Sequence, residues 1–137
     1  TRESAKIIDE QVERIKEKDE NSLNATHIVK QDALTMKEAL LKGDVKLLAA
    51  TMNHSWVAKK KMAASISNKL IDSACEKAIN AGAYSAKVSG AGGGGFIIFV
   101  VDPAKRSRVV NALNSLGGNV VNFHFVKNGV KGWKIYE

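Results

Sequence analysis

The most informative stretch of the sequence is KVSGAGGGGFIIFVV, which occupies residues 87–101. Five of the eleven glycines in the chain lie between positions 90 and 95 of this stretch. The residues 96–101 that follow contain no polar side chain and are mainly β-branched and aromatic. Such a run predicts a central β-strand that is buried on both faces and is entered directly from a glycine-rich loop.

The glycine-rich loop holds more glycine than a turn between two strands requires. Glycine destabilises an ordered element by roughly 0.5–1 kcal/mol per residue relative to alanine, and a tight turn needs only one or two. Clustered glycines instead present backbone N–H groups with no side chain in front of them, and such groups bind phosphate oxygens or allow another segment to approach closely. A glycine-rich turn that binds nothing is the alternative interpretation.

Two common phosphate-binding motifs do not fit this loop. The P-loop requires a Lys followed by Ser or Thr after the glycines, and none is present. The dinucleotide fingerprint can be placed on Gly90, Gly92 and Gly95, but it should open a helix, whereas a strand-like run follows here. Both motifs are therefore excluded by their context.

Upstream of the loop, the sequence predicts helices. Apolar residues recur at spacings of three and four through residues 5–78, and Trp56 continues one such stripe, which makes it a predicted core residue. Gly43 and Gly82 each follow a stripe at the position that glycine favours after a helix. The first half is therefore predicted to be helical.

Downstream of the loop, a helix and two further strands are predicted. Asp102-Pro103 is typical of a helix start, and Gly117-Gly118 of its end. Apolar and polar residues alternate over 121–125, and Asn128-Gly129 predicts a type I′ turn into a last strand at 130–136. The predicted fold class is α+β: a ferredoxin-like four-stranded antiparallel sheet with helices on one side, preceded by a helical segment.

Composition and charge narrow the function classes. The chain is 45% hydrophobic and 26% charged, which is typical of a globular domain, and no apolar run approaches the ~20 residues that span a bilayer. The net charge of +7 favours anionic partners, but no block of five like charges resembles a nucleic-acid-binding tail. A single cysteine, Cys75, and scattered histidines predict neither a disulfide nor a metal site. We expect a cytoplasmic protein that binds neither nucleic acid nor membrane.

The glycine-rich loop and its flanking residues resemble a known family. Residues 87–95 are similar to the third motif of the GHMP sugar kinases, the superfamily of galactokinase, homoserine kinase and mevalonate kinase. Further residues resemble the bacterial D-glycero-D-manno-heptose 7-phosphate kinase branch: Trp56-x-x-Lys59-Lys60, Ile66-Ser67, Ile71-Asp72, Gly82-Ala83 and Phe96. The resemblance covers essentially the whole chain and is strongest over 82–99.

The resemblance extends only to the carboxy-terminal domain of these kinases. The first family motif, a Gly-Leu-Gly-Ser-Ser loop that wraps the ATP phosphates, does not occur in this sequence. The catalytic Asp and the magnesium-binding residues of the family also belong to the amino-terminal half, so the resemblance implies no catalytic residue and no metal ligand in this chain. Residues 1–137 are therefore expected to form one carboxy-terminal domain, and the start at Thr1 suits a domain cut from a longer protein.

The resemblance also implies roles for individual residues. In the family this loop helps to shape the phosphate and substrate site, a role that would fall here to Gly90, Ala91, Gly92, Gly93 and Gly94. Four nearby side chains are candidates for direct phosphate contacts: Lys59, Lys60, Lys87 and Ser89. Each has an ordinary alternative, because charged runs usually lie on solvated faces and a serine beside a turn often bonds its own backbone.

The function that follows from the resemblance is phosphoryl transfer. A full enzyme of this kind would use ATP and Mg²⁺ to phosphorylate a sugar phosphate, with heptose 7-phosphate the favoured acceptor and the 1,7-bisphosphate, a precursor of lipopolysaccharide heptose, as product. The 137-residue chain alone is expected to be inactive. The alternative is a stand-alone ferredoxin-like module that binds a small anion or has a regulatory role without catalysis. No pattern in the sequence indicates an oligomeric state.

Overall fold

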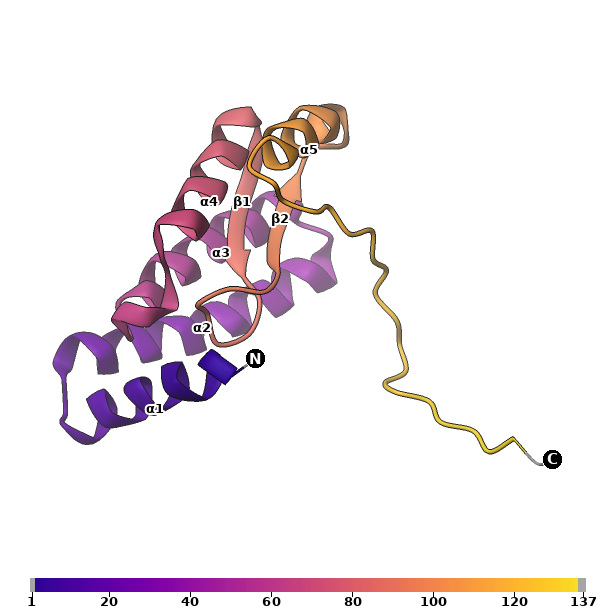
Figure 1. Ribbon diagram of the computed structural model, residues 1–137. Coiled ribbons are helices and arrows are strands. Elements are labelled where there is room, and N and C mark those ends of the chain that lie inside the picture. The colour runs from indigo at the N-terminus through magenta and orange to yellow at the C-terminus, as the bar shows by residue number, and fades with distance from the viewer. Residues whose placement is uncertain (1, 136–137) are drawn as a thin grey trace.

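Five α-helices and two β-strands make up the regular structure of the described part of the chain. The computed structural model describes the backbone of residues 2–135 and the side chains of residues 4–135 (Figure 1). The elements are α1 (Arg2–Lys16), α2 (Glu20–Lys42), α3 (Val45–Lys60), the short 3₁₀ helix η1 (Ala64–Ile66), α4 (Lys69–Ala81), β1 (Ala83–Val88), β2 (Ile97–Val101), the 3₁₀ helix η2 (Pro103–Lys105) and α5 (Arg106–Asn114).

The helices end where their local sequence predicts. Gly43 and Gly82 follow α2 and α4 in the left-handed conformation, with φ of 69° and 111°, which glycine adopts without the steric cost that a Cβ brings. The Asp44 carboxylate accepts a hydrogen bond from the N–H of Leu47 at 2.9 Å and so caps the start of α3. Asp102 caps η2 in the same way, through the N–H of Ala104.

The two strands form an antiparallel pair, in which Lys87 lies opposite Ile98. Only one edge of β1 faces β2. The other edge is covered by Asn53 of α3, whose side-chain amide donates to the carbonyl of Tyr84 at 2.9 Å and accepts from the N–H of Ala86 at 3.4 Å. The amide therefore takes the place of a neighbouring strand and protects this edge from further pairing.

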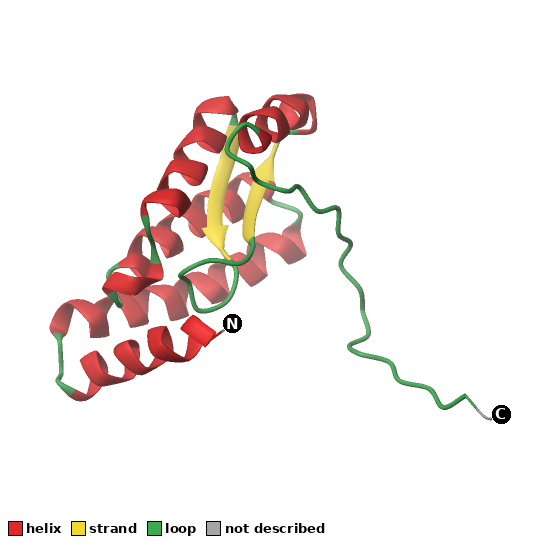
Figure 2. Cartoon of the chain, viewed as in Figure 1, coloured by secondary structure: helices red, strands yellow, loops and turns green. Residues whose placement is uncertain are grey.

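Helices cover both faces of β1 and one face of β2, whereas the sequence analysis expected helices on one face of the sheet only. On one face, Phe99 packs in a cluster with Ala78 of α4 and Val109 of α5. The side chain of Lys87 lies on the opposite face, because successive residues of a strand alternate. Helix α3 runs behind the strands on that side and contacts β1, so the preceding helical segment supplies the second layer (Figure 2).

The described residues hold two strands rather than the predicted four. Residues 119–135 are extended chain without helix or strand and run away from the body of the protein (Figure 1). Gly129 lacks the positive φ that a type I′ turn needs, so the predicted hairpin between 121–125 and 130–136 is not formed. Without a ladder partner, Phe123 and Phe125 are 59% and 91% exposed instead of facing a core. The end of the last predicted strand, Tyr136, lies outside the described residues.

The central strand is also less buried than its sequence predicts. Ile97, Phe99 and Val101 pack against the two apolar clusters, but Phe96 and Ile98 are 68% and 40% exposed. The second face of β2 is open because α3 covers mainly β1. Trp56, by contrast, is a core residue as predicted, at 5% exposure.

None of the described helices is both long enough and apolar enough to cross a membrane.

Candidate functional site

The glycine-rich loop joins β1 to β2 and is closed by a hydrogen bond from the N–H of Ser89 to the carbonyl of Phe96, 2.8 Å long. Each of its five glycines has a positive φ, from 74° at Gly93 to 155° at Gly94. Residues that carry a side chain rarely adopt such φ angles, so the backbone conformation of the loop requires glycine. The loop is thus a specific conformation and not a generic turn.

Two of the glycines are packed closely against other elements. A Cβ on Gly92 would lie 2.7 Å from the carbonyl oxygen of Ile66, and one on Gly93 would lie 2.5 Å from Cδ1 of Ile7. The N–H of Gly93 also donates to the carbonyl of Ile66 at 2.9 Å. This side of the loop therefore rests directly on η1 and α1.

The other side of the loop faces a shallow hollow. A Cβ on Gly90, Gly94 or Gly95 would meet no atom within 4 Å. Ser4 of α1 and residues 89–96 line a hollow of about 270 Å³ at this place. The loop thus has a packed face and an open face, and only the open face can receive a ligand.

Helix α1 is held against the loop region by Glu10. Its carboxylate accepts hydrogen bonds from the N–H groups of Ala64 at 2.8 Å and Ser65 at 3.4 Å, and also from the Ser65 hydroxyl. The Ser65 hydroxyl, together with the two backbone N–H groups and Arg14, lowers the pKa of Glu10 below its usual value. These contacts fix the element that carries Ser4 beside the hollow.

Two of the predicted phosphate-contacting lysines, Lys59 and Lys87, lie on elements that adjoin the start of the loop. The Lys59 ammonium, at the end of α3, donates to the carbonyl of Gly90. Burial lowers the pKa of Lys59, and the nearby Lys87 ammonium lowers this pKa further. Burial also lowers the pKa of Lys87. Both ammonium groups are thus partly withdrawn from water, which disfavours their charged forms.

The third lysine, Lys60, has a different environment. Its ammonium pairs with the carboxylate of Asp72 at 3.2 Å and lies 5.8 Å from the ring centroid of Trp56. The Ser67 hydroxyl donates to the same Asp72 carboxylate at 2.9 Å. Lys60 therefore forms an ion pair with a carboxylate, whereas among residues 4–135 Lys59 and Lys87 form none. The Ser89 side chain is exposed at the rim of the hollow.

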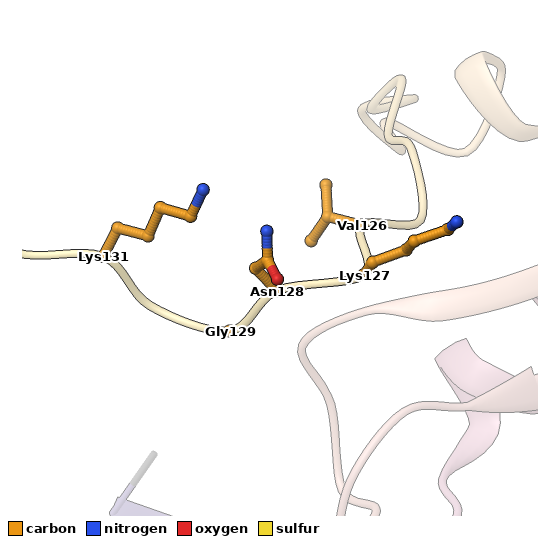
Figure 3. Close-up of a pocket in the computed structure, with 5 residues that line it drawn as sticks. All are labelled: Val126, Lys127, Asn128, Gly129 and Lys131. Carbon is orange, nitrogen blue, oxygen red and sulfur yellow. The ribbon is translucent and has the colours of Figure 1, made fainter.

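A second hollow, of about 460 Å³, lies along the C-terminal segment (Figure 3). Val126, Lys127, Asn128, Gly129 and Lys131 line it, and all five come from a single bend of the extended chain. No other element of the described structure closes this hollow. It lacks the buried walls of a binding site.

The fold and the loop together define a class of protein: an α+β domain with a glycine-rich loop between two antiparallel strands. Residues 36–119 match the family described as GHMP kinases C terminal. The chain belongs to this family. It is 47% identical over 117 residues to D-glycero-alpha-D-manno-heptose 7-phosphate kinase of Campylobacter jejuni, an alignment that covers 85% of this chain and 34% of the relative.

Solved structures support the same assignment. A crystal structure of L. major mevalonate kinase in complex with R-mevalonate matches with a TM-score of 0.68 and 26% identity, over 82% of this chain and 34% of that protein. The Lin0012 protein from Listeria innocua has the same fold, with a TM-score of 0.79 and 21% identity over 88% and 35% of the two chains. This chain spans about a third of the length of these proteins.

The glycine-rich loop and the lysines stand out in the sequence, but the residues that hold the surrounding elements in place do not. Glu10 and Asn53 contact partners more than 30 positions away, and neither belongs to a recognisable motif. Ile66 was part of the family resemblance, but its contact with Gly92 was not predictable from that pattern. No local signal marks such long-range contacts.

Proposed function

We propose that this chain is the carboxy-terminal part of an ATP-dependent sugar kinase that converts D-glycero-D-manno-heptose 7-phosphate to its 1,7-bisphosphate. The observation that carries the proposal is the 47% identity to the Campylobacter jejuni heptose 7-phosphate kinase. Membership of the GHMP kinases supports the reaction class independently of that relative. The lysines and the open face of the loop support an anionic substrate.

The loop has a positioning role in this proposal. Phosphoryl transfer depends mainly on the placement of the reacting groups and on charge stabilisation. The backbone of residues 90–94 would shape the phosphate end of the substrate site, with Ser89, Lys59 and Lys87 at its border. Lys60, whose ammonium pairs with Asp72, would stabilise the protein structure next to the loop and would not contact the phosphate.

ATP and Mg²⁺ would be held mainly by the part of the protein outside this chain. Among the described residues, no group of three His, Cys, Asp or Glu side chains could hold a metal ion. By the family resemblance, the magnesium ligands and the catalytic residue would lie in that other part as well. The reaction would take place in the bacterial cytoplasm and supply heptose for lipopolysaccharide.

The test is an assay of ADP release by the protein encoded by the whole reading frame that contains these residues. It would be given ATP, Mg²⁺ and a panel of sugars and sugar phosphates. Turnover selective for heptose 7-phosphate is the expected result. Turnover with another sugar would support the proposed reaction class and would contradict heptose 7-phosphate as the acceptor.

The 137-residue chain by itself should show no ATP-dependent turnover above a control without enzyme. Activity of the isolated chain would overturn this part of the proposal. Silence of the longer, folded protein across the whole panel would favour the alternative, a module that binds a small anion without catalysis.

A further inference from the structure

We propose that the outward face of α1 is the docking surface for the amino-terminal part of a longer protein to which this chain belongs. The surface consists of Ala5, Ile8, Val12 and Ile15, which form the α1 stripe. The inference goes beyond the proposed function and rests on it in one respect, namely that the remaining part of the protein is amino-terminal to this chain.

The α1 stripe is an apolar face that points away from the body of the protein. Its members follow one another at spacings of three, four and three residues, so they lie on one side of the helix. Ile8, Val12 and Ile15 are 50%, 41% and 39% exposed, and no member of the stripe belongs to either apolar cluster of the described residues. A surface helix of a globular protein normally turns such a stripe towards the core. The stripe is therefore free to contact a surface outside the described chain.

The inner side of α1 is held to the body mainly by polar contacts. Its one buried apolar side chain in the described part of the helix is Ile7, at 3% exposure. Glu10 accepts hydrogen bonds from the N–H groups of residues 64–65 and pairs with Arg14 at 3.3 Å. Because neighbouring positions on a helix differ by about 100°, α1 cannot rotate to bury Ile8 without withdrawing Ile7 and breaking the Glu10 contacts. These contacts fix the outward orientation of the stripe, and covering it requires another surface.

The size of the α1 stripe favours a tethered partner over a second copy of this chain. A helix of 15 residues is about 22 Å long. A stripe one side chain wide on this helix covers only a fraction of the area, roughly 800 Å², that each partner buries in a stable dimer. A partner in the same polypeptide has a high effective concentration and needs less contact area.

The comparisons indicate which part of a longer protein lies near α1. The Campylobacter jejuni relative is aligned over only 34% of its length, and residues 36–119 match a family model of the C-terminal part. Helix α1 precedes this matched region and lies at the outside of the molecule, beside α2 (Figure 1). The amino-terminal part would therefore reach α1 first, and an apolar patch on that part would cover the stripe.

Docking at the α1 stripe would place the amino-terminal part next to the glycine-rich loop. On its inner side, α1 carries Ser4, which lines the hollow beside the loop, and Ile7, which lies against Gly93. Helix α1 would then lie between the loop and the amino-terminal part. The position of the hollow relative to the ATP-binding part would depend on this helix.

Hydrogen exchange of the α1 amides, measured without substrate, tests the docking surface in the protein encoded by the whole reading frame. We expect these amides to exchange about tenfold or more slowly there than in the 137-residue chain. The reason is that covering partly exposed aliphatic side chains stabilises the helix against local opening. The double variant Ile8→Ser with Val12→Ser should remove this protection in the longer protein and leave exchange in the 137-residue chain unchanged.

The matched control is the double variant Lys6→Ser with Glu13→Ser. It replaces two exposed polar side chains of α1 and, like the stripe variant, keeps the net charge, so it should retain the protection. Equal exchange of α1 in the long and the short protein, or an equal loss of protection in the control, would overturn the docking surface. Faster exchange of the stripe variant in the 137-residue chain would also overturn it, because the stripe would then pack within this chain.

Two further outcomes separate this inference from its alternatives. Concentration-dependent protection of α1 in the 137-residue chain, with a doubled mass in sedimentation, would overturn the amino-terminal part as the occupant in favour of a second copy. If α1 is protected in the longer protein but no kinase activity is found, the proposed function fails and the docking surface stands. If the longer protein is an active kinase whose α1 exchanges as in the short chain, the docking surface fails and the proposed function stands.

Discussion

At the scale of single residues, the loop glycines divide into two kinds that mutation should distinguish. In Gly90→Ala the new Cβ would meet no atom within 4 Å. Only the positive φ would then lower the free energy of unfolding, by about 1–2 kcal/mol. Alanine at Gly92 has the same φ problem and would also press its Cβ against the backbone of Ile66 at 2.7 and 2.8 Å. We expect Gly92→Ala to lower the free energy of unfolding by about 3 kcal/mol or more.

Urea unfolding of the two variants measures this difference. Gly129→Ala is the control, because Gly129 has no positive φ and a Cβ at this position would meet no atom within 4 Å. This variant should stay within about 0.5 kcal/mol of the parent chain. Equal losses in Gly90→Ala and Gly92→Ala would contradict a packed and an open face of the loop.

The Glu10 carboxylate should make stability depend on pH in the acid range. Its pKa in the folded chain lies below the ordinary value of 4.5, so its hydrogen bonds to the 64–65 segment stabilise the fold above that value. This contribution is lost as the pH falls through the folded pKa. Relative to Glu10→Gln, the parent chain should be more stable by about 1 kcal/mol near neutral pH, with the advantage gone in acid.

Unfolding by urea at several pH values tests this dependence. Glu17→Gln serves as the matched control, because Glu17 is exposed just after α1 and its variant should follow the parent chain at every pH. A constant difference between Glu10→Gln and the parent chain, unaffected by acid, would show that the carboxylate charge has no part in holding α1.

At the scale of elements, Asn53 decides which edge of the sheet is available. Its amide satisfies the Tyr84 carbonyl and the Ala86 N–H on the free edge of β1. Asn53→Ala leaves both groups without these partners and should lower the free energy of unfolding by about 1–3 kcal/mol. Hydrogen exchange should then quicken at Ala86, whereas the amide of Ser89, which donates to Phe96, should keep its protection. Unchanged exchange at Ala86 would contradict the role of Asn53.

The pairing of α2 with α3 includes one buried charge. The Asp32 carboxylate of α2 has a side-chain exposure of 11% and lies 2.9 and 3.0 Å from Nδ1 of His54 on α3. His54→Ala should cost about 1–2 kcal/mol, because it leaves the carboxylate without this partner. Adding Asp32→Asn should recover part of the loss, and a double-mutant cycle measures the coupling. His27→Ala, on the exposed side of α2, is the control; fully additive losses at Asp32 and His54 would contradict the pairing.

At the scale of the whole molecule, local signals predicted the helices and the loop well. Gly43, Asp44 and Gly82 act within one helical turn, so their roles are encoded by neighbouring residues. The loop is likewise a continuous stretch whose glycines indicate its backbone conformation. The two-sided helical cover of β1 was not predicted, because it depends on contacts between α3 and β1 that are distant in sequence.

The same reasoning explains where the strand prediction failed. Alternation over residues 121–125 describes which side chains could share a face, but a strand also needs a neighbour to hydrogen-bond with. One edge of β1 is occupied by Asn53, and the described residues place nothing along the outer edge of β2. Similarly, the apolar run 96–101 predicted a strand buried on both faces. Phe96 and Ile98 are exposed because no second layer covers them in the described structure. Residues 121–125 therefore have the sequence pattern of a strand, but no strand of the described structure pairs with them.

The two tryptophans allow a test of whether a longer protein supplies that partner. Trp56 is 5% exposed in the core, and Trp133 is 81% exposed in the extended C-terminal segment. In the 137-residue chain, the variant Trp56→Phe reports the fluorescence of Trp133 alone, and Trp133→Phe reports that of Trp56 alone. Acrylamide should quench Trp133 several times more strongly than Trp56. Exposed apolar side chains gain about 25 cal/mol per Å² when covered, and an open strand edge favours pairing. We therefore expect Trp133 to become shielded in the protein encoded by the whole reading frame, while Trp56 stays unchanged. Equal quenching of Trp133 in the short and the long protein would mean that the C-terminal segment remains unpaired in both.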